Sequence, residues 1–304
     1  MLHHIDPTVD CVFKAIFGTK GNEYLLIHFL NSLLQLDHPI SSLTIENPYN
    51  DKQQLDAKLS VVDIMARDQC GHVYQIELQL TSPTHLSSRM SFNLSQLHSR
   101  QLVQGEEFSQ ISRTFAIWLC LQDVKFKYTE AGPHDYDFRF VMYDTHRSTI
   151  LNEDFQIHVL LLNRWLKPEH LSPVDRWIYF FTQAKNWRKL PQELQNKPIK
   201  RAMKVLEKFS EQEESYYQYL ERFNIRAKEI SLDAEYRQIQ EDYDQIQNDY
   251  NQIKNDYGKA LATVEQLEQN KVNSAKKLIA LNTMSNEQIA DISGLTVEQI
   301  NKLT

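Results

Sequence analysis

"VYQIELQL", residues Val73–Leu80, is the stretch on which the interpretation of the fold rests. Its side chains alternate along an extended backbone, so Tyr74 and Ile76 point to one face, and Glu77 and Gln79 point to the other. The first face is typical of a strand packed on a core. The second face carries a carboxylate and an amide side by side, and it is either a solvated face or a functional site.

The segment before it is predicted to form a second strand. "KLSVVDIMA" at 58–66 has strand character, and the polar, glycine-containing "RDQCGH" separates it from the first stretch, which predicts a β-hairpin. A turn centred on Cys70 pairs Asp63 with Glu77, with Cβ atoms about 4.5–5.5 Å apart. Like charges in such a pair destabilise a sheet, so the two carboxylates require a compensating cation.

A hard divalent ion is one such cation. Mg²⁺ prefers oxygen ligands and is often held by carboxylates together with water and substrate phosphate. Asp63 and Glu77 are therefore the candidate metal ligands. The alternative is structural: Asp63 pairs with Lys58 or Arg67, or a shift of one residue in register moves the two carboxylates to opposite faces.

The surrounding sequence predicts an α/β core, with a mixed sheet flanked by helices. A helical pattern occupies 23–36, and "HLSSRMSFNLSQLHSRQLVQG" at 85–105 predicts a helix that ends at Gly105. Further strands are predicted at 115–121, 138–144 and 156–162.

Beyond Pro168 the strand signals disappear, and the rest of the chain predicts an all-helical C-terminal region with a heptad repeat. The expected domains are a core at 1–165, a helical extension at 166–230, a heptad-repeat helix at 231–272 and a short tail at 273–304.

The heptad repeat places tyrosine at every seventh residue and isoleucine three residues after it. Its members are Tyr236, Ile239, Tyr243, Ile246, Tyr250, Ile253 and Tyr257, continued by Val264 and Leu267. This spacing predicts a coiled coil that joins copies of the chain into a homo-oligomer through residues 236–267. The alternative is a single solvated helix, or a helix folded back on its own chain.

The tail predicts two short helices with matching starts. Ser285 with Gln288, and Thr296 with Gln299, each fit a capping box, and Gly294 suits the helix end between them. The pattern is typical of a small helix-turn-helix. Its second helix offers only Lys302 as a cation, so packing or protein contact is as well supported as DNA contact.

Composition limits the classes of function. The net charge is -7, with 40 acidic and 33 basic residues, so a nucleic-acid partner would require a locally basic cleft. The three cysteines form no CxxC pair, and neither a disulfide framework nor a metal-binding histidine is predicted. The start lacks a signal-peptide pattern, and no apolar run approaches the roughly 20 residues of a membrane helix, so we expect a cytoplasmic protein without membrane contact.

Asp63 followed by Glu77-Leu78-Gln79 resembles the PD-(D/E)XK nuclease signature, in the variant where glutamine replaces lysine. The flanking segments are similar to the Rpn family of recombination-promoting nucleases and transposases. These segments are "DPTVDCVFKAIFG", "YLLIHFLNSLL", Arg89 with "QLVQG", "DRWIYFF" and "GLTVEQI".

The resemblance implies a restriction-endonuclease-like core that cuts DNA with Mg²⁺, or with Mn²⁺, in bacterial recombination, transposition or phage defence. Asp63 and Glu77 would bind the metal, and Gln79 would take the catalytic position of the lysine. A neutral amide orients water by hydrogen bonds but supplies no charge. The alternative is a weak or inactive nuclease fold retained as a DNA-binding or oligomeric module.

Three basic residues are candidates for contacts with DNA phosphates. Arg89 and Arg100 follow the hairpin on one predicted helix, and Lys14 precedes it. The alternative for each is a solvated or salt-bridged side chain on an amphipathic helix.

Overall fold

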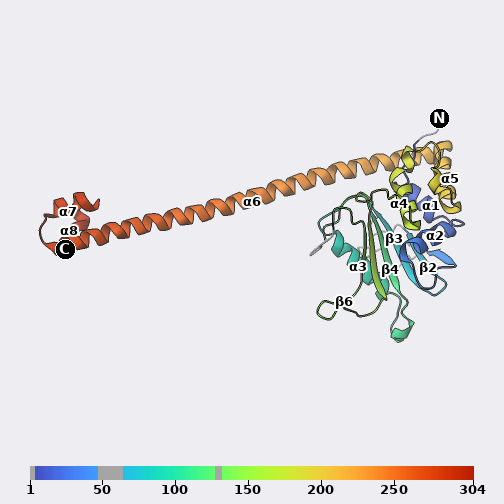
Figure 1. Cartoon of the computed structure of the whole chain (residues 1–304), viewed down its shortest axis with the longest axis horizontal. Helices are drawn as coiled ribbons and strands as arrows, with labels where there is room; N and C mark the ends of the chain where they lie inside the picture. The colour runs from blue at the N-terminus through green and yellow to red at the C-terminus, as the bar shows by residue number, and fades with distance from the viewer. Residues whose placement is uncertain (1–3, 47–63, 127–131) are drawn as a thin grey trace. The chain divides into compact units, whose positions relative to one another are not determined.

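The computed structural model describes residues 4–46, 64–126 and 132–304. The chain divides into two units, Met1–Asp233 and Ala234–Thr304, and each is described by itself. Figure 1 labels the elements of both.

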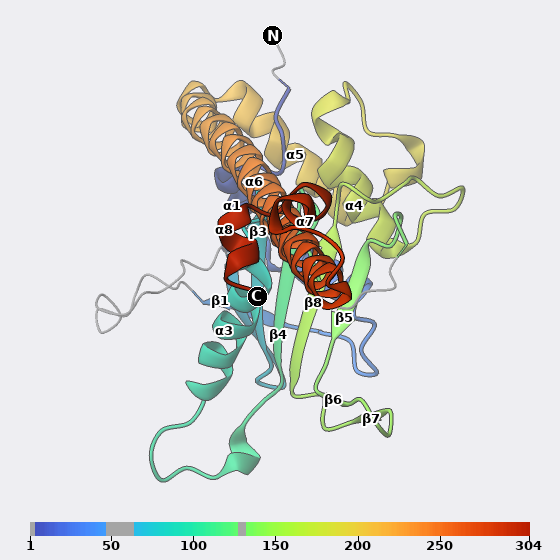
Figure 2. The same cartoon turned by 90° about the vertical axis from the view of Figure 1, so that its left-hand side faces the viewer.

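The first unit is built on a six-stranded mixed sheet in the order β1-β2-β3-β4-β8-β5. Strands β2 and β3 form an antiparallel hairpin. Strands β3, β4 and β8 run parallel to one another (Figure 2). Antiparallel strands β1 and β5 form its edges. The strands are β1 (Leu43–Glu46), β2 (Ile64–Asp68), β3 (Val73–Gln79), β4 (Thr114–Cys120), β5 (Asp137–Phe140) and β8 (Phe155–Leu161), and a separate ribbon pairs β6 (Tyr143–Asp144) with β7 (Thr149–Ile150).

Helices cover both faces of the sheet, as the alternating strands require. The larger core packs α1, α2, α4, α5 and the start of α6 (Glu213–Leu281) on the face that holds Tyr74, Ile76 and Phe115, and the smaller core packs α3 on the opposite face. The two faces are visible on either side of β3 and β4 in Figure 1. The helices are α1 (Asp10–Phe17), α2 (Glu23–Leu34), α3 (Leu86–Ser99), α4 (Pro173–Gln183) and α5 (Lys197–Glu211), with short 3-10 turns at Phe108–Gln110, Ala184–Asn186 and Gln192–Leu194.

The hairpin has the register that the sequence predicts. Ile64 pairs with Ile76, and Met65 pairs with Gln75. The expected partner of Glu77 is Asp63, which lies outside the described residues. The register is therefore confirmed over the described part of β2.

Two segments differ from the expectation. The helix after the hairpin ends at Ser99 rather than near Gly105, because Gln101 turns to donate a hydrogen bond to the Thr114 hydroxyl at 2.7 Å. Gly105, with φ of +98°, belongs to the following turn. The predicted strand at 138–144 is interrupted, so that Asp137–Phe140 joins the main sheet while Tyr143–Asp144 joins the ribbon.

The second unit consists of the later part of α6 (Glu213–Leu281) together with α7 (Asn286–Ser293) and α8 (Val297–Asn301). The two short helices pack on the end of the long helix through a small apolar core. That core contains Ala275, Ile289, Ala290 and Ile300.

Both predicted capping boxes are formed, and Gly294 takes the left-handed conformation at φ of +67°. Among the described residues, no helix combines the length and apolarity that a membrane span requires.

Candidate functional site

The polar face of β3 is dry. Gln75 is 1% exposed and Glu77 is 3% exposed, and the Gln75 amide Nε2 donates a hydrogen bond to Glu77 Oε1 at 3.0 Å. On the other face, Tyr74 and Ile76 are fully buried, as predicted. The interpretation of the Glu77 face as a solvated strand face is therefore excluded.

Helix α3 is what excludes water from this face. Its apolar residues Leu86, Met90 and Leu94 pack against the same core as Trp118 and Cys120 of β4. The three residues follow one another at intervals of four, so they lie on one face of the helix. Because β3 and β4 run parallel in register, Trp118 is the neighbour of Glu77 and Cys120 is the neighbour of Gln79.

Arg89 brings a positive charge over the same face of the sheet. Its guanidinium carbon lies 5.1 Å from the centre of the Trp118 ring, within the range of a cation–π contact. Burial raises the pKa of the Cys120 thiol to about 12, and the charge of Arg89 acts against that rise. Arg89 therefore lies over β4, next to β3, the strand that carries Glu77 and Gln79.

Four polar atoms around this face are buried without a hydrogen-bond partner among the described residues. They are Gln75 Oε1, Arg89 Nε, Asn93 Nδ2 and Trp118 Nε1. Buried polar groups in proteins are almost always paired, so such a cluster calls for a bound ligand, ion or water. The four atoms belong to β3, β4 and α3, the elements that meet on the face of Glu77, which is the one predicted metal ligand that the structure describes.

Gln79 lies at the C-terminal end of β3 and is half-buried. Its amide nitrogen donates a hydrogen bond to the Thr81 carbonyl at 2.7 Å, which fixes the orientation of the amide. The residue shares the face of Glu77, as the alternation of the strand predicts.

One alternative for Asp63 is an ion pair with Arg67, and it stays a prediction because Asp63 lies outside the described residues. Arg67 donates hydrogen bonds to Glu46 Oε1 at 2.9 Å and to the Gly71 carbonyl at 3.0 Å. Arg67 therefore contacts the edge strand β1 and the turn of the hairpin. Lys58, like Asp63, lies outside the described residues.

The three predicted phosphate contacts occupy different places. Arg89 lies over the site, while Arg100 is an exposed residue at the end of α3, about 16 Å further along the helix axis. Lys14 is in the last turn of α1, where its carbonyl accepts a hydrogen bond from Gly18. The structure thus associates Arg89 with the face of Glu77 and Gln79, and it does not gather the three cations into one patch.

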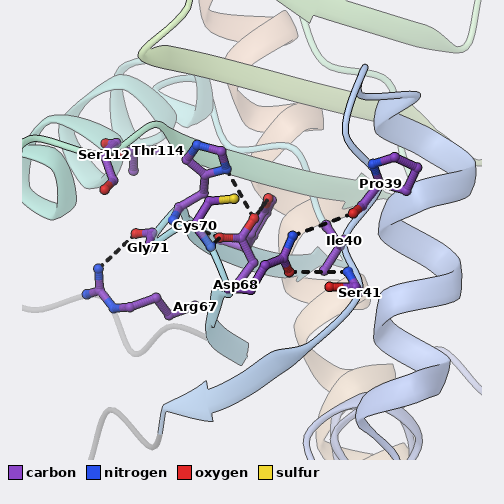
Figure 3. A network of polar contacts seen from close by, with 12 residues as sticks. Pro39, Ile40, Ser41, Arg67, Asp68, Cys70, Gly71, Ser112 and Thr114 are labelled. Atoms are coloured by element: carbon purple, nitrogen blue, oxygen red, sulfur yellow. Dashed lines mark hydrogen bonds and ion pairs between the residues drawn. The ribbon is translucent and has the colours of Figure 1, made fainter.

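A second group of side chains that could bind a metal ion lies at the turn of the hairpin (Figure 3). Ligand atoms of Asp68, Cys70 and His72 all fall within 4.8 Å of one another. The Asp68 carboxylate already accepts hydrogen bonds from the Cys70 and His72 backbone N–H groups, at 2.8 and 2.9 Å, and from the Tyr74 hydroxyl, at 2.8 Å. Burial and the hydrogen bond to Asp68 raise the pKa of Tyr74.

Through these hydrogen bonds the Asp68 carboxylate stabilises the tight turn of the hairpin. The group lies at the opposite end of β3 from Glu77, about 17 Å along the strand from His72. It is therefore separate from the predicted magnesium site. No histidine was predicted to bind metal, although Asp68, Cys70 and His72 stand at alternate positions in the sequence.

The arrangement on the Glu77 face combines a buried carboxylate, a fixed amide and a nearby guanidinium. Oxygen donors of this kind suit a hard cation such as Mg²⁺, and a guanidinium suits a phosphate oxygen. A metal-assisted reaction on a phosphate ester is the chemistry that such a set can perform.

Comparison with known proteins agrees with this assignment of chemistry. No curated protein and no solved structure matches the chain. A family model described as "PD-(D/E)XK nuclease family transposase" matches residues 7–235, which include β3, α3 and the whole sheet. The chain therefore belongs to the PD-(D/E)XK nuclease family transposases.

Proposed function

We propose that the protein is a Mg²⁺-dependent DNA endonuclease that hydrolyses phosphodiester bonds, with Mn²⁺ as an alternative metal. The observation that carries the proposal is the burial of Glu77 on a face where four polar atoms have no described partner. Membership of the nuclease family supports it independently.

Asp63 and Glu77 are the proposed metal ligands. The pairing of Ile64 with Ile76 supports this choice, because the same register continued by one residue would pair Asp63 with Glu77. A bound divalent ion would supply an activated water and neutralise charge on the scissile phosphate. It would also offset the cost of burying a carboxylate away from water.

Gln79 and Arg89 are the proposed positioning groups. The hydrogen bond from Gln79 to the Thr81 carbonyl holds the amide in one orientation, so its oxygen is available to orient a water molecule. Arg89 lies over Trp118, where its charge can attract a phosphate oxygen. Arg100 and Lys14 are proposed as outer contacts with the DNA backbone.

A second candidate function is an oligomeric, DNA-binding module in which cleavage is weak or lost. The exposed apolar face of α6 favours it. Every tyrosine and isoleucine of the heptad repeat from Tyr236 to Tyr257 is more than half exposed in the single chain. We propose that a second copy of this helix covers the face through residues 236–267.

The charges beside the face favour a parallel pair of helices. Asp242, Asp249 and Asp256 each precede a tyrosine, so they form one edge of the apolar stripe, and Lys254 follows an isoleucine on the other edge. An antiparallel pair would bring the Asp edges together. A parallel pair instead places Asp249 opposite Lys254 of the second copy, which is the favourable contact.

The broader assignments are proposals of the same kind. We propose action in bacterial recombination, transposition or phage defence, a cytoplasmic location, and the domain limits 1–165, 166–230, 231–272 and 273–304. The family description supports the link to transposition.

Plasmid cleavage tests the proposed function. Wild-type protein should nick supercoiled plasmid only when Mg²⁺ or Mn²⁺ is present, and Glu77→Ala should lose that activity while its circular dichroism spectrum is retained. Equal cleavage by the two proteins would exclude Glu77 as a catalytic ligand. Cleavage by neither protein would favour the oligomeric module.

A further inference from the structure

A hollow of about 240 Å³ lies between the end of α1 and the outer side of α5. Its walls come from the Thr19–Asn22 loop and from the α5 residues that face it, and Val205 and Phe209 contribute apolar lining. None of the predicted site residues lines this hollow.

The hollow is strongly basic. Of the described residues that line it, Lys20, Arg201, Lys204 and Lys208 carry a positive charge and none carries a negative charge. All four are exposed, and no described carboxylate forms an ion pair with them.

Of the four cations, Lys20 is coupled electrostatically to a nearby acid, Glu23. Its pKa is lowered, first by the hydrogen bond that the Gly21 N–H donates to it, and to a smaller extent by Lys20. Glu23 is therefore already engaged by the backbone of the loop, and it does not neutralise the charges on α5.

Three of the cations fall on one face of α5 by helical spacing. Arg201, Lys204 and Lys208 follow at intervals of three and four residues, so their side chains lie above one another. Like charges at such spacings destabilise a helix modestly. A bound anion between them would reverse that effect, and this chain has a net charge of -7, which makes an unneutralised basic cluster unusual for it.

The hollow lies on the α1 and α5 side of the sheet, the face opposite Glu77, and its loop approaches the start of the hairpin strand β2. The position of a Cβ on Gly18, next to the loop, is 3.7 Å from Ile64 Cγ1. Ile64 pairs with Ile76, the residue before Glu77. Gly18 therefore lies beside the start of β2, at the level of Ile76 and Glu77 along the hairpin, and the Thr19–Asn22 loop that follows it lines the basic hollow.

We propose that this hollow binds backbone phosphates of the nucleic acid on which the Glu77 site acts. The proposal rests on the proposed nuclease function, and it extends that function by assigning a substrate-binding surface on α5 and the Thr19–Asn22 loop. Lysine and arginine in a concave site are suited to phosphate oxygens, and such contacts are independent of base sequence. The ligand chemistry is a phosphate group, from a nucleic-acid backbone or from free phosphate.

The test is the salt dependence of DNA binding, measured by fluorescence anisotropy of a labelled duplex in EDTA, so that cleavage is excluded. The variant is Lys204→Gln/Lys208→Gln. The matched control is Lys189→Gln/Lys228→Gln, which removes the same charge from exposed lysines that do not line the hollow.

The slope of log K against log salt concentration should fall by about 1.8 in the Lys204/Lys208 variant, since each lost phosphate contact contributes about 0.9 for duplex DNA. Affinity should fall roughly tenfold or more at low salt. The control should stay close to wild type. Each single substitution should give about half of the change in slope, so the proposal stays testable if the double variant unfolds.

Equal losses in the variant and its control would overturn the proposal, because they would reflect net charge alone. Unchanged DNA binding by the variant would overturn it too. If DNA binding by the variant is unchanged but inorganic phosphate binds wild type, as measured by phosphorus nuclear magnetic resonance, the ligand of the hollow is free phosphate and not the DNA backbone.

Cleavage by wild type separates this proposal from the proposed function. If wild type cuts plasmid with Mg²⁺ but the variant binds DNA normally, the hollow is not the binding surface and the nuclease assignment stands. If wild type does not cut and the slope still falls in the variant, the binding surface stands and cleavage is excluded.

Discussion

Glu77 and Tyr243 depart in opposite ways from the usual distribution of side chains. Glu77 in the first unit is a carboxylate that is 3% exposed, while Tyr243 in the second unit is a large aromatic side chain that is 56% exposed. Buried carboxylates and contiguous exposed apolar faces are both uncommon in soluble proteins.

The comparison teaches what each unit requires. A buried carboxylate requires a positive partner, and on the Glu77 face Arg89 and the orphaned polar atoms of α3 and β4 accompany it. An exposed apolar stripe requires another apolar surface. We therefore propose an ion on the Glu77 face of the first unit and a second copy of the chain on the apolar stripe of the second.

The largest expected effect comes from changing the stripe. Ile246→Asp/Ile253→Asp should raise the dissociation constant of the oligomer at least about a thousandfold, because each copy would expose two side chains worth about 1.5–3 kcal/mol each on burial. Sedimentation equilibrium measures it. The control, Asn248→Asp/Asn255→Asp, adds the same charge away from the stripe, and an identical loss in both would show that the stripe is not the interface.

The amide of Gln79 should have the next largest effect. Gln79→Leu should slow cleavage about a hundredfold, because an apolar side chain cannot orient the attacking water. Gln79→Lys should keep activity, since lysine is the residue of the related signature. Single-turnover nicking with saturating Mg²⁺ measures both rates. Cleavage by Gln79→Leu at the wild-type rate would show that the Gln79 amide has no role in catalysis.

A pH effect is expected from His158. Burial lowers the pKa of this imidazole to about 3, so the folded protein keeps it neutral at pH values where the unfolded chain protonates it. Stability is therefore lost as pH falls below the ordinary histidine pKa of about 6.5, by up to about 1.4 kcal/mol per pH unit. Urea unfolding between pH 7 and 5 should show this slope in wild type, and His158→Gln should reduce it. Identical slopes would contradict the prediction.

The smallest effect concerns the orientation of the helices. Lys254→Asp should weaken association by about 1 kcal/mol, because two symmetric contacts with Asp249 would become repulsive. The charge swap Asp249→Lys/Lys254→Asp should recover most of that loss in a parallel pair. An antiparallel pair would not bring the two positions together, so the swap would then give no recovery.

The sequence predicted features that depend on neighbouring residues along the chain. The alternation of β3, the hairpin register and the capping boxes of α7 and α8 all follow from local spacing, and the structure confirms them. The family resemblance is likewise confirmed by the match to residues 7–235. The end of α3 was predicted wrongly, because the side chain of Gln101 bonds to the distant Thr114.

The features that sequence reasoning missed arise between elements. The position of Arg89 over Trp118 and the basic hollow beside α5 both need the packing of segments far apart in the chain. Strand β1 was also not predicted, since its few residues carry little pattern and its edge position depends on pairing with β2. The roles of Asp63, Glu77 and Gln79 stay predictions.

The effect of divalent cations on unfolding tests the central claim most directly. If Glu77 is a metal ligand, Mg²⁺ at about 100 times its dissociation constant should raise the free energy of unfolding of wild type by about 2.7 kcal/mol. The same addition should leave Glu77→Gln nearly unchanged, because the amide cannot replace the carboxylate as a ligand. Equal stabilisation of both proteins by Mg²⁺ and Mn²⁺, or of neither, would contradict the account.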